Sequence, residues 1–184
     1  MIYVFLDIEA TCKVPEKTRE IIRLSAVLWC DERQVVLAVF DMYIKPIYSK
    51  LNEYCTELTG ITNDDLNNFG VSFNDAISKL DKLMYYYGVF RDGKYAFVTI
   101  TDWDIGIMLP QQAKISRCKL PKYYKNKRKR IDLQMDFKNY EGFANVGLKN
   151  MLNYYGKEFD GTQHNSVDDC MNTLKLFKAI YCYE

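Results

Sequence analysis

The segment that most constrains the fold of this chain is IYVFLDIE at residues 2–9, an apolar run that ends in two acids. Its β-branched and aromatic residues and its short length predict a central β-strand. Asp7 and Glu9 occupy alternate positions, so in a strand their side chains lie on the same face. Neighbouring carboxylates repel each other unless one is protonated or a cation lies between them. The segment therefore predicts either a cation site at the strand end or a solvated pair of acids just beyond it.

The composition limits the classes of protein to which this chain can belong. With 184 residues, of which 48% are hydrophobic, it can form one domain with a sizeable core, and we expect a single domain over residues 1–184. The formal net charge of +1 provides no overall field toward nucleic acid or membrane. No apolar run is long enough for a transmembrane helix, and the first residues lack the basic start of a signal peptide. We therefore expect a cytoplasmic or nuclear protein with no membrane association.

The cysteines give no sign of a disulfide scaffold. They form no C-x-x-C pair, and without a secretory signal we expect reduced, incidental or buried thiols and no structural zinc site. The six residues are Cys12, Cys30, Cys55, Cys118, Cys170 and Cys182.

The order of the elements predicts a mixed sheet flanked by helices. Gly60 is expected to end one helix and Ser72 to begin the next, with Phe73, Ile77, Leu80 and Met84 on one face. Pro110 is expected to break a later helix. The predicted strands cover residues 2–8, 20–30, 34–46, 94–100 and 130–133, and the predicted helices cover 50–62, 71–88, 101–115, 145–156 and 167–183.

Two further segments offer acids that could join Asp7 and Glu9. TITDWDIGIM supplies Asp102 and Asp104 after the fourth predicted strand, although Thr101 or Asp102 could equally be a helix cap. Acids on separate elements that converge at one sheet edge would provide hard oxygen ligands for Mg²⁺ or Mn²⁺.

The second segment, GTQHNSVDDC, combines His164 with Asp168 and Asp169. With Asn165 or Ser166 as the N-cap, both aspartates could simply favour the first turn of a helix. His164 is the only histidine of the chain, and imidazole is well suited to accept a proton near neutral pH. Acids and one histidine together are the groups needed for two-metal phosphodiester hydrolysis.

The ordered set of D-x-E, an aspartate after TDW, and H-x(4)-D resembles the DEDDh 3′–5′ exonuclease superfamily. The segments DIEATC, EIIRLSAVL, YIKP, LNEYCTELTGIT and TDWDI are similar to the branch that contains the histone-mRNA 3′ exonuclease and the enhancer-of-RNA-interference nucleases. The likeness runs from about Ile2 to the last predicted helix. It implies an α/β fold of the RNase H-like class, with a mixed five-stranded sheet flanked by helices.

The resemblance also implies roles for individual residues. Family members usually have a TDG-x-WD segment that is two residues longer than TDWD here, so we match Asp104 and keep Asp102 in reserve. The H-x(4)-D spacing selects Asp169 rather than Asp168. The implied catalytic residues are the metal-binding acids Asp7, Glu9, Asp104 and Asp169 and the general base His164, with two divalent cations, Mg²⁺ or Mn²⁺, as cofactors.

Substrate contacts are expected beside these acids. Tyr54 and Leu58 are four residues apart on a predicted helix, so they share a face that could sandwich a base. In the resembled branch the terminal base packs at these positions with Trp103 nearby; alternatively, all three side chains could be core. We also assign substrate binding to Ala10 and Thr11, which follow the acidic pair.

A basic run from Lys119 to Arg130, interleaved with Tyr123 and Tyr124, could be a nucleic-acid track, a nuclear localisation signal or a solvated loop. We favour the track, and we assign substrate binding to Lys122 and Arg128 because basic groups neutralise phosphates.

The favoured function is a metal-dependent 3′–5′ exoribonuclease that acts on single-stranded RNA 3′ ends or overhangs and releases nucleoside 5′-monophosphates. Three alternatives stay open from the sequence. They are a DNA-preferring exonuclease on the same fold, a binding module with an inactive site that covers 3′ ends, and an interaction protein whose acids are caps and surface groups.

Overall fold

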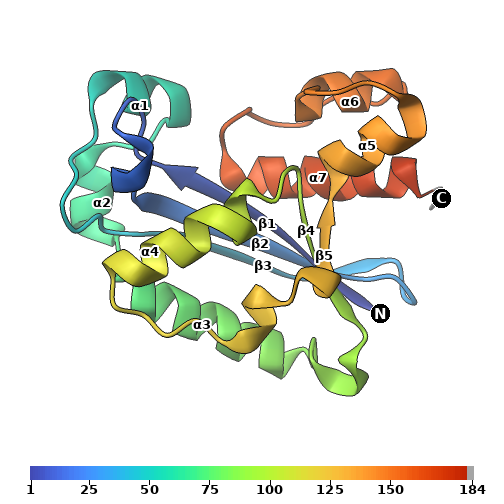
Figure 1. Ribbon diagram of the computed structural model, residues 1–184, viewed down its shortest axis with the longest axis horizontal. Helices are drawn as coiled ribbons and strands as arrows, with labels where there is room; N and C mark the ends of the chain where they lie inside the picture. Colours follow the sequence, from blue (N-terminus) through green and yellow to red (C-terminus); the bar gives the residue numbers. More distant parts are fainter. Residues whose placement is uncertain (182–184) are drawn as a thin grey trace.

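The computed structural model describes residues 1–181, and its centre is one five-stranded mixed sheet of order β3-β2-β1-β4-β5 (Figure 1). The β1–β2 and β2–β3 pairs are antiparallel, whereas the β1–β4 and β4–β5 pairs are parallel. This confirms the mixed five-stranded sheet predicted from the sequence. The strands are β1 (Ile2–Ala10), β2 (Ile21–Cys30), β3 (Val35–Tyr43), β4 (Tyr95–Thr99) and β5 (Arg130–Asp132).

Helices cover both faces of the sheet, with α3 and α4 on one side and α5, α6 and α7 on the other (Figure 1). The pair α1 and α2 lies at the end of the sheet toward which β1 runs. The α-helices of the described chain are α1 (Glu53–Thr59), α2 (Asn63–Phe69), α3 (Phe73–Tyr86), α4 (Leu109–Ile115), α5 (Leu133–Glu141), α6 (Leu148–Tyr154) and α7 (Ser166–Ile180).

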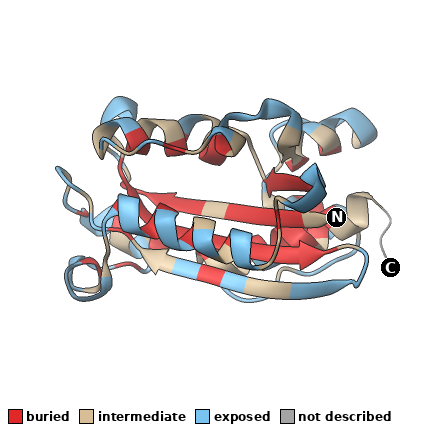
Figure 2. Ribbon diagram, turned by 90° about the horizontal axis from the view of Figure 1, so that it is seen from below, coloured by how far each residue is buried: buried red, intermediate tan, exposed pale blue. Residues whose placement is uncertain are grey.

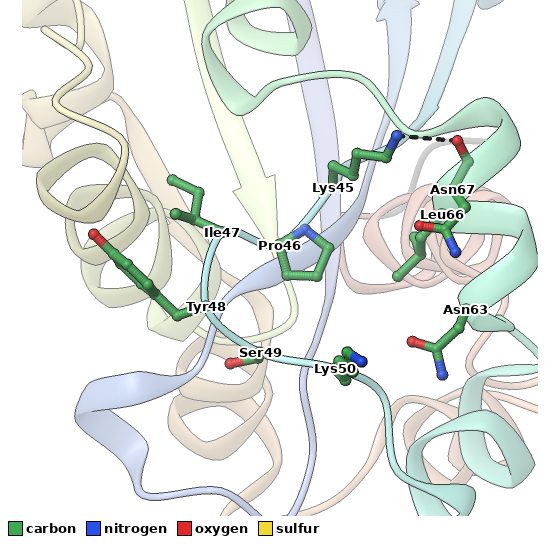
Figure 3. Close-up of a pocket in the computed structure, with 9 residues that line it drawn as sticks. All are labelled: Lys45, Pro46, Ile47, Tyr48, Ser49, Lys50, Asn63, Leu66 and Asn67. Carbon is green, nitrogen blue, oxygen red and sulfur yellow. Dashed lines mark hydrogen bonds between the residues drawn. The ribbon is translucent and has the colours of Figure 1, made fainter.

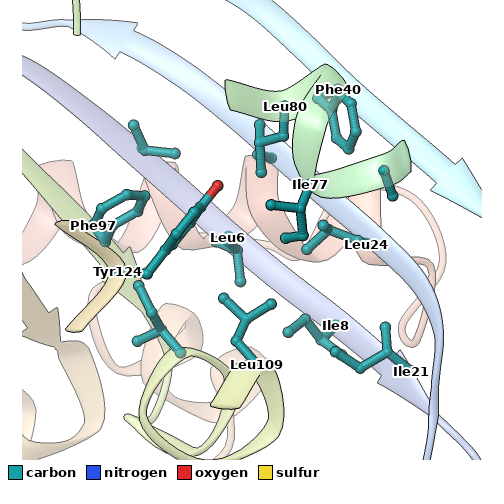
Figure 4. Close-up of a cluster of buried hydrophobic side chains, with 14 of the residues drawn as sticks. Leu6, Ile8, Ile21, Leu24, Phe40, Ile77, Leu80, Phe97, Leu109 and Tyr124 are labelled. Atoms are coloured by element: carbon teal, nitrogen blue, oxygen red, sulfur yellow. The ribbon is translucent and has the colours of Figure 1, made fainter. Parts of the chain in front are cut away.

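The two faces of β1 follow the period-two alternation of a strand. Val4, Leu6, Ile8 and Ala10 point into the core formed with α3 and α4, where Leu6 and Ile8 lie near Ile77 and Leu109 (Figure 4). Tyr3 and Phe5 point the other way, into the core formed with α7. Asp7 and Glu9 continue this second face, so the sequence pattern directs both carboxylates toward α7.

Burial matches this arrangement. Figure 2 shows β1 and β2 almost entirely buried, while the outer faces of the helices are exposed. Among the described helices none has the length and apolar character needed to span a membrane.

Several predictions of local structure are confirmed. The Ser72 side chain accepts a hydrogen bond from the Asp75 backbone amide, so Ser72 begins α3 as expected. Gly60 ends α1 in the left-handed region with φ of +70°, which glycine adopts without steric cost. The apolar face predicted for α3 is buried, and it comprises Phe73, Ile77, Leu80 and Met84.

Other predictions are corrected. Pro110 does not break a helix, because it occupies the second position of α4, where the helix changes from π-helical to α-helical hydrogen bonding. A π-helical turn, Trp103–Met108, leads directly into α4. The sequence did not predict α2 or α5, and α7 ends at Ile180 rather than at residue 183. Residues 182–183 of that predicted helix, including Cys182, lie outside the described residues.

Candidate active site

Three carboxylates from two elements meet at the end of β1. Oxygen atoms of Asp7, Glu9 and Asp169 all lie within 4.8 Å of one another. Asp7 and Glu9 extend from the face of β1 on which α7 packs, and Asp169 comes from the first turn of α7. Carboxylate oxygens are the ligands that Mg²⁺ and Mn²⁺ prefer, so this donor set fits a divalent cation.

Asp104 lies beside this cluster and Asp102 does not join it. Asp104 is buried in the π-helical turn that follows β4, and its charge contributes to raising the pKa of Asp7. The carboxylate of Asp102 instead forms an ion pair of 3.0 Å with Arg130. Gly106 permits this pairing, because a Cβ at that position would overlap the Asp102 carboxylate.

The three acids of the cluster and the neighbouring Asp104 resist ionisation together. Burial, followed by the charge of Asp169, raises the pKa of Glu9 to about 8. Burial also raises the pKa of Asp169 to about 7. For Asp7 and Asp104, burial and the neighbouring carboxylates raise the pKa well above the ordinary value. Such a cluster binds protons when no cation is bound, and a divalent cation would displace them.

A partly buried hydrogen-bond network that was not predicted from the sequence lies behind the carboxylates. In the β1–β2 register Asp7 faces Ser25 and Glu9 faces Arg23. The Arg23 guanidinium makes two hydrogen bonds of 2.8 Å with Asp41 of β3. The sequence does contain a signal for this network, because Arg23 and Ser25 are polar residues at alternate positions of an otherwise apolar strand.

His164 lies at the rim of the site, just before α7. Its side chain is exposed, and it lines a cavity of about 250 Å³ together with Asp169. Its φ of +63° is in the left-handed region, which histidine adopts more often than most residues. A backbone hydrogen bond from His164 lowers the pKa of Asp169 against the larger effect of burial. The neighbouring Asp168 is occupied elsewhere, because its carboxylate accepts from the backbone amide of Thr162 at 2.9 Å.

The residues assigned to the terminal base differ in exposure. Tyr54 on α1 is 42% exposed, whereas Leu58 and Trp103 are half-buried. Ala10 and Thr11 are buried at the end of β1. The Thr11 hydroxyl and backbone amide both bond to the backbone of Glu20.

The part of the basic run from Lys122 to Arg130 lies at the other end of the sheet. Its Lys129 amine lies 5.1 Å from the centre of the Tyr95 ring at the start of β4, and Tyr95 pairs with Ile2. Asp7 is five residues further along β1, which corresponds to about 17 Å at the rise of a strand. Lys122 and Arg128 are exposed on this run.

The aromatic residues of the basic run belong to the core. Tyr124 is 1% exposed, stacks on Phe97 and donates a hydrogen bond to Asp81. Tyr123 packs on Phe90 at 4.1 Å between ring centres. The Tyr124 ring is covered by protein, so it cannot stack on a base in a nucleic-acid track.

The buried carboxylate of Glu20 holds the loop before α1. It accepts hydrogen bonds of 2.6–2.9 Å from three backbone amides, those of Ile47, Tyr48 and Ser49. Figure 3 shows this loop beside α2, around a cavity of about 470 Å³ in which Lys45 donates to the carbonyl of Asn67. This role of Glu20 was not predicted, because the amides that stabilise its charge are remote from it in sequence.

The five cysteines of the described residues are free thiols. Cys12 and Cys55 lie near the site, with their sulfur atoms 2.9 Å apart, and α1 is further joined to this region by a hydrogen bond from Asn52 to the Cys12 carbonyl.

Comparison with known proteins agrees with this geometry. A family model described as Exonuclease (RNase_T) matches residues 4–177. ERI1 exoribonuclease 2 of Xenopus laevis is 31% identical over 97% of this chain and 28% of its own length. The human 3′-5′ exoribonuclease 1 is 29% identical over 93% of this chain and 50% of its own length. The chain thus spans about half or less of these curated relatives.

Solved structures agree as well. The nuclease domain of 3′hExo, described as a DEDDh family member bound to rAMP, aligns with a TM-score of 0.86 and 28% identity, covering 98% of this chain and 90% of that one. A 3′-exonuclease solved with a histone mRNA stem-loop aligns with a TM-score of 0.88 and 28% identity over 98% of this chain and 80% of that one. The predicted RNase H-like fold is confirmed. This chain belongs to the exonuclease family, in its DEDDh branch.

Proposed function

We propose that this chain is a metal-dependent 3′–5′ exoribonuclease that removes nucleotides from single-stranded RNA 3′ ends or 3′ overhangs. The observation that carries the proposal is the meeting of Asp7, Glu9 and Asp169 within 4.8 Å at the end of β1, with Asp104 beside them. The related nuclease domain bound to rAMP supports a nucleoside 5′-monophosphate as the product.

The acids of the cluster would hold two divalent cations, Mg²⁺ or Mn²⁺. Such cations, when bound, lower the pKa of a water and stabilise negative charge on the phosphate and the leaving oxygen. Asp7 and Glu9 of β1 and Asp169 of α7 would supply carboxylate oxygens to these cations, and Asp104 of the π-helical turn would supply another.

His164 is the proposed general base. Its imidazole stands at the rim of the cavity that Asp169 also lines, so it can accept the proton of the attacking water. The exposure of His164 leaves it free to pass this proton on to solvent.

The terminal base is proposed to pack against Tyr54, Leu58 and Trp103, with Ala10 and Thr11 at the floor of the site. Stacking on aromatic rings tolerates any base, which suits an enzyme that removes nucleotides in succession. Because the basic run lies at the start of β4, Lys122 and Arg128 are proposed to contact RNA only well upstream of its 3′ end. We also propose that residues 1–184 act as one exonuclease domain, in the cytoplasm or nucleus.

A labelled-RNA assay tests the proposal. A 5′-labelled single-stranded RNA is incubated with Mg²⁺, Mn²⁺ or EDTA and resolved on a sequencing gel, for the wild type, for Asp7→Ala, and for Asp64→Ala as a control at an exposed acid of α2. The expected result is a metal-dependent ladder that shortens from the 3′ end and is absent only for Asp7→Ala. Intact RNA with every metal contradicts the proposal, and a matched DNA substrate then separates a DNA-preferring exonuclease from an inactive 3′-end-binding module.

A further inference from the structure

The loop between β1 and β2 places a cation over each of two proposed base-binding rings. The Lys13 amine lies 3.7 Å from the centre of the Tyr54 ring. The Arg19 guanidinium carbon lies 5.9 Å from the Trp103 ring. Tyr54 belongs to α1 and Trp103 to the π-helical turn, so one loop supplies a positive charge to two different elements. Both distances are within the range of cation–π contacts.

This loop is held in place by hydrogen bonds at its ends and near its middle. At its base the Thr11 amide donates to the Glu20 carbonyl at 2.9 Å, and the Glu20 amide donates to the Thr11 hydroxyl at 3.0 Å. The side-chain amide of Gln111 donates to the carbonyls of Glu16 and Arg19, each at 2.9 Å. The cations are therefore presented by an ordered backbone, which reduces the entropy lost when a ligand binds.

Both cations also retain capacity to bind an anion. Within residues 1–181 neither Lys13 nor Arg19 has a carboxylate within ion-pair distance. The buried Nε of Arg19 has no hydrogen-bond acceptor among the described residues. A guanidinium offers five donors in a planar fork that matches the oxygens of a phosphate.

We propose that Lys13 and Arg19 bind the RNA phosphate on the 5′ side of the penultimate nucleotide, one position upstream of the phosphate that is cleaved. The proposal rests on the function proposed above and adds two substrate-binding residues to it. A base stacked on Tyr54 or Trp103 would place its backbone beside the same loop, where cations alternate with aromatic rings. This combination of positive charge and stacking surfaces is how proteins hold single-stranded nucleic acid without reading its sequence.

A purely supporting role makes a different prediction. If Lys13 and Arg19 only hold the two rings, their removal weakens binding of a mononucleotide and of an oligonucleotide equally. If they bind the upstream phosphate, a mononucleotide is unaffected because it lacks that phosphate. Salt dependence separates the two roles further, because each lost phosphate contact on a single strand reduces the slope of log Kd against log salt by about 0.7.

The test measures binding rather than turnover. In a His164→Asn background with Mn²⁺, dissociation constants for 5′-AMP and for oligoadenylates of increasing length are determined at several salt concentrations. Arg19→Gln, Lys13→Gln and the double variant are compared with Arg19→Lys, which keeps the charge. Lys17→Gln is the control, because Lys17 is an exposed cation of the same loop.

The expected result is weaker oligonucleotide binding and a slope lower by about 0.7 for each glutamine variant, with 5′-AMP affinity within about twofold of the parent. Arg19→Lys should restore the slope and Lys17→Gln should leave it unchanged. An unchanged slope in the double variant, or equal losses for 5′-AMP and oligonucleotide, overturns the proposal. If the parent binds neither ligand and the wild type degrades no RNA, the proposed function itself fails, which is a distinguishable outcome.

Discussion

The hydroxyl of Ser25 on β2 lies 2.6 Å from the hydroxyl of Ser166, the first residue of α7, and both side chains are fully buried. Ser25 also donates to the Asp41 carboxylate at 2.7 Å. A hydroxyl has one proton, so Ser25 can only accept from Ser166, which must be the donor of the pair. This directed chain fixes the turn of α7 that carries Asp169 relative to the strand that faces Asp7.

We predict unequal costs for removing the two hydroxyls. Ser25→Ala leaves the buried Ser166 hydroxyl without its acceptor and should lower the free energy of unfolding by about 1–3 kcal/mol. Ser166→Ala leaves Ser25 bonded to Asp41 and should cost about 1 kcal/mol. Urea denaturation of the metal-free protein measures both values.

The double variant provides the check on this pair. Because Ser25 and Ser166 act through one bond, the double variant should cost less than the sum of the single variants. The control is Ser72→Ala, which removes the exposed N-cap of α3 and should lower the free energy of unfolding by about 1 kcal/mol. Its effect should add to that of Ser25→Ala or of Ser166→Ala. Full additivity between Ser25→Ala and Ser166→Ala would contradict the hydrogen-bond chain.

A second prediction separates the two aspartates that flank Trp103. Asp104→Asn should remove most of the rise in melting temperature that Mn²⁺ produces, because a ligand of the native state stabilises it by mass action. Asp102→Asn should keep that rise but lower the melting temperature without metal, since it weakens the ion pair with the partly buried Arg130. Thermal unfolding with and without millimolar Mn²⁺ measures both effects, and the reverse pattern would assign the metal to Asp102.

Part of the site could be predicted from local periodicity, because the alternation of β1 puts Asp7 and Glu9 on one face. The choice of Asp169 over Asp168 came instead from the H-x(4)-D spacing of the resembled family. The network around Arg23 depends instead on which strands are neighbours and in which register. Asp41 meets Arg23 only because β3 pairs with β2, and this pairing brings together residues 18 positions apart.

The failure to predict α2 and α5 has a simpler cause. The described part of α2 buries only Leu66, and α5 buries only Leu133 and Phe137, so neither shows a full apolar stripe. The distance between the basic run and the acids could not be predicted, because the sequence does not reveal the direction of β5. Since β5 is parallel to β4, the residues before Arg130 lie at the far end of the sheet.

The raised carboxyl pKa values predict that the metal-free protein loses stability as pH rises. The pKa of Glu9 is about 8 and that of Asp169 about 7, against ordinary values of 4.5 and 3.8. The folded state therefore holds these protons more tightly than the unfolded chain does. Their contribution is complete below the ordinary values and is lost as pH rises through 7 to 8. The melting temperature in EDTA should fall from about pH 5 to about pH 8.

Two further measurements test whether these carboxyl groups cause the pH dependence of the melting temperature. Glu9→Gln cannot ionise, so its melting temperature should change less with pH than that of the wild type. Metal binding requires deprotonated ligands, so Mn²⁺ should raise the melting temperature more at the upper end of this range than at the lower end. A melting temperature that rises with pH in EDTA would show that these carboxyl groups are ionised in the folded protein.

The last prediction concerns His164. His164→Asn removes the proposed base while tolerating the left-handed backbone at this position, where φ is +63°. General-base catalysis contributes about 10²–10⁴-fold, so kcat on single-stranded RNA should fall by this factor while KM and the Mn²⁺-induced rise in melting temperature stay near wild type. Gln163→Ala is the control, because Gln163 lines the same cavity without a group that titrates near neutral pH. A general base should contribute far more than about threefold to kcat. If His164→Asn turns over RNA within about threefold of the Gln163→Ala rate, another group therefore accepts the proton.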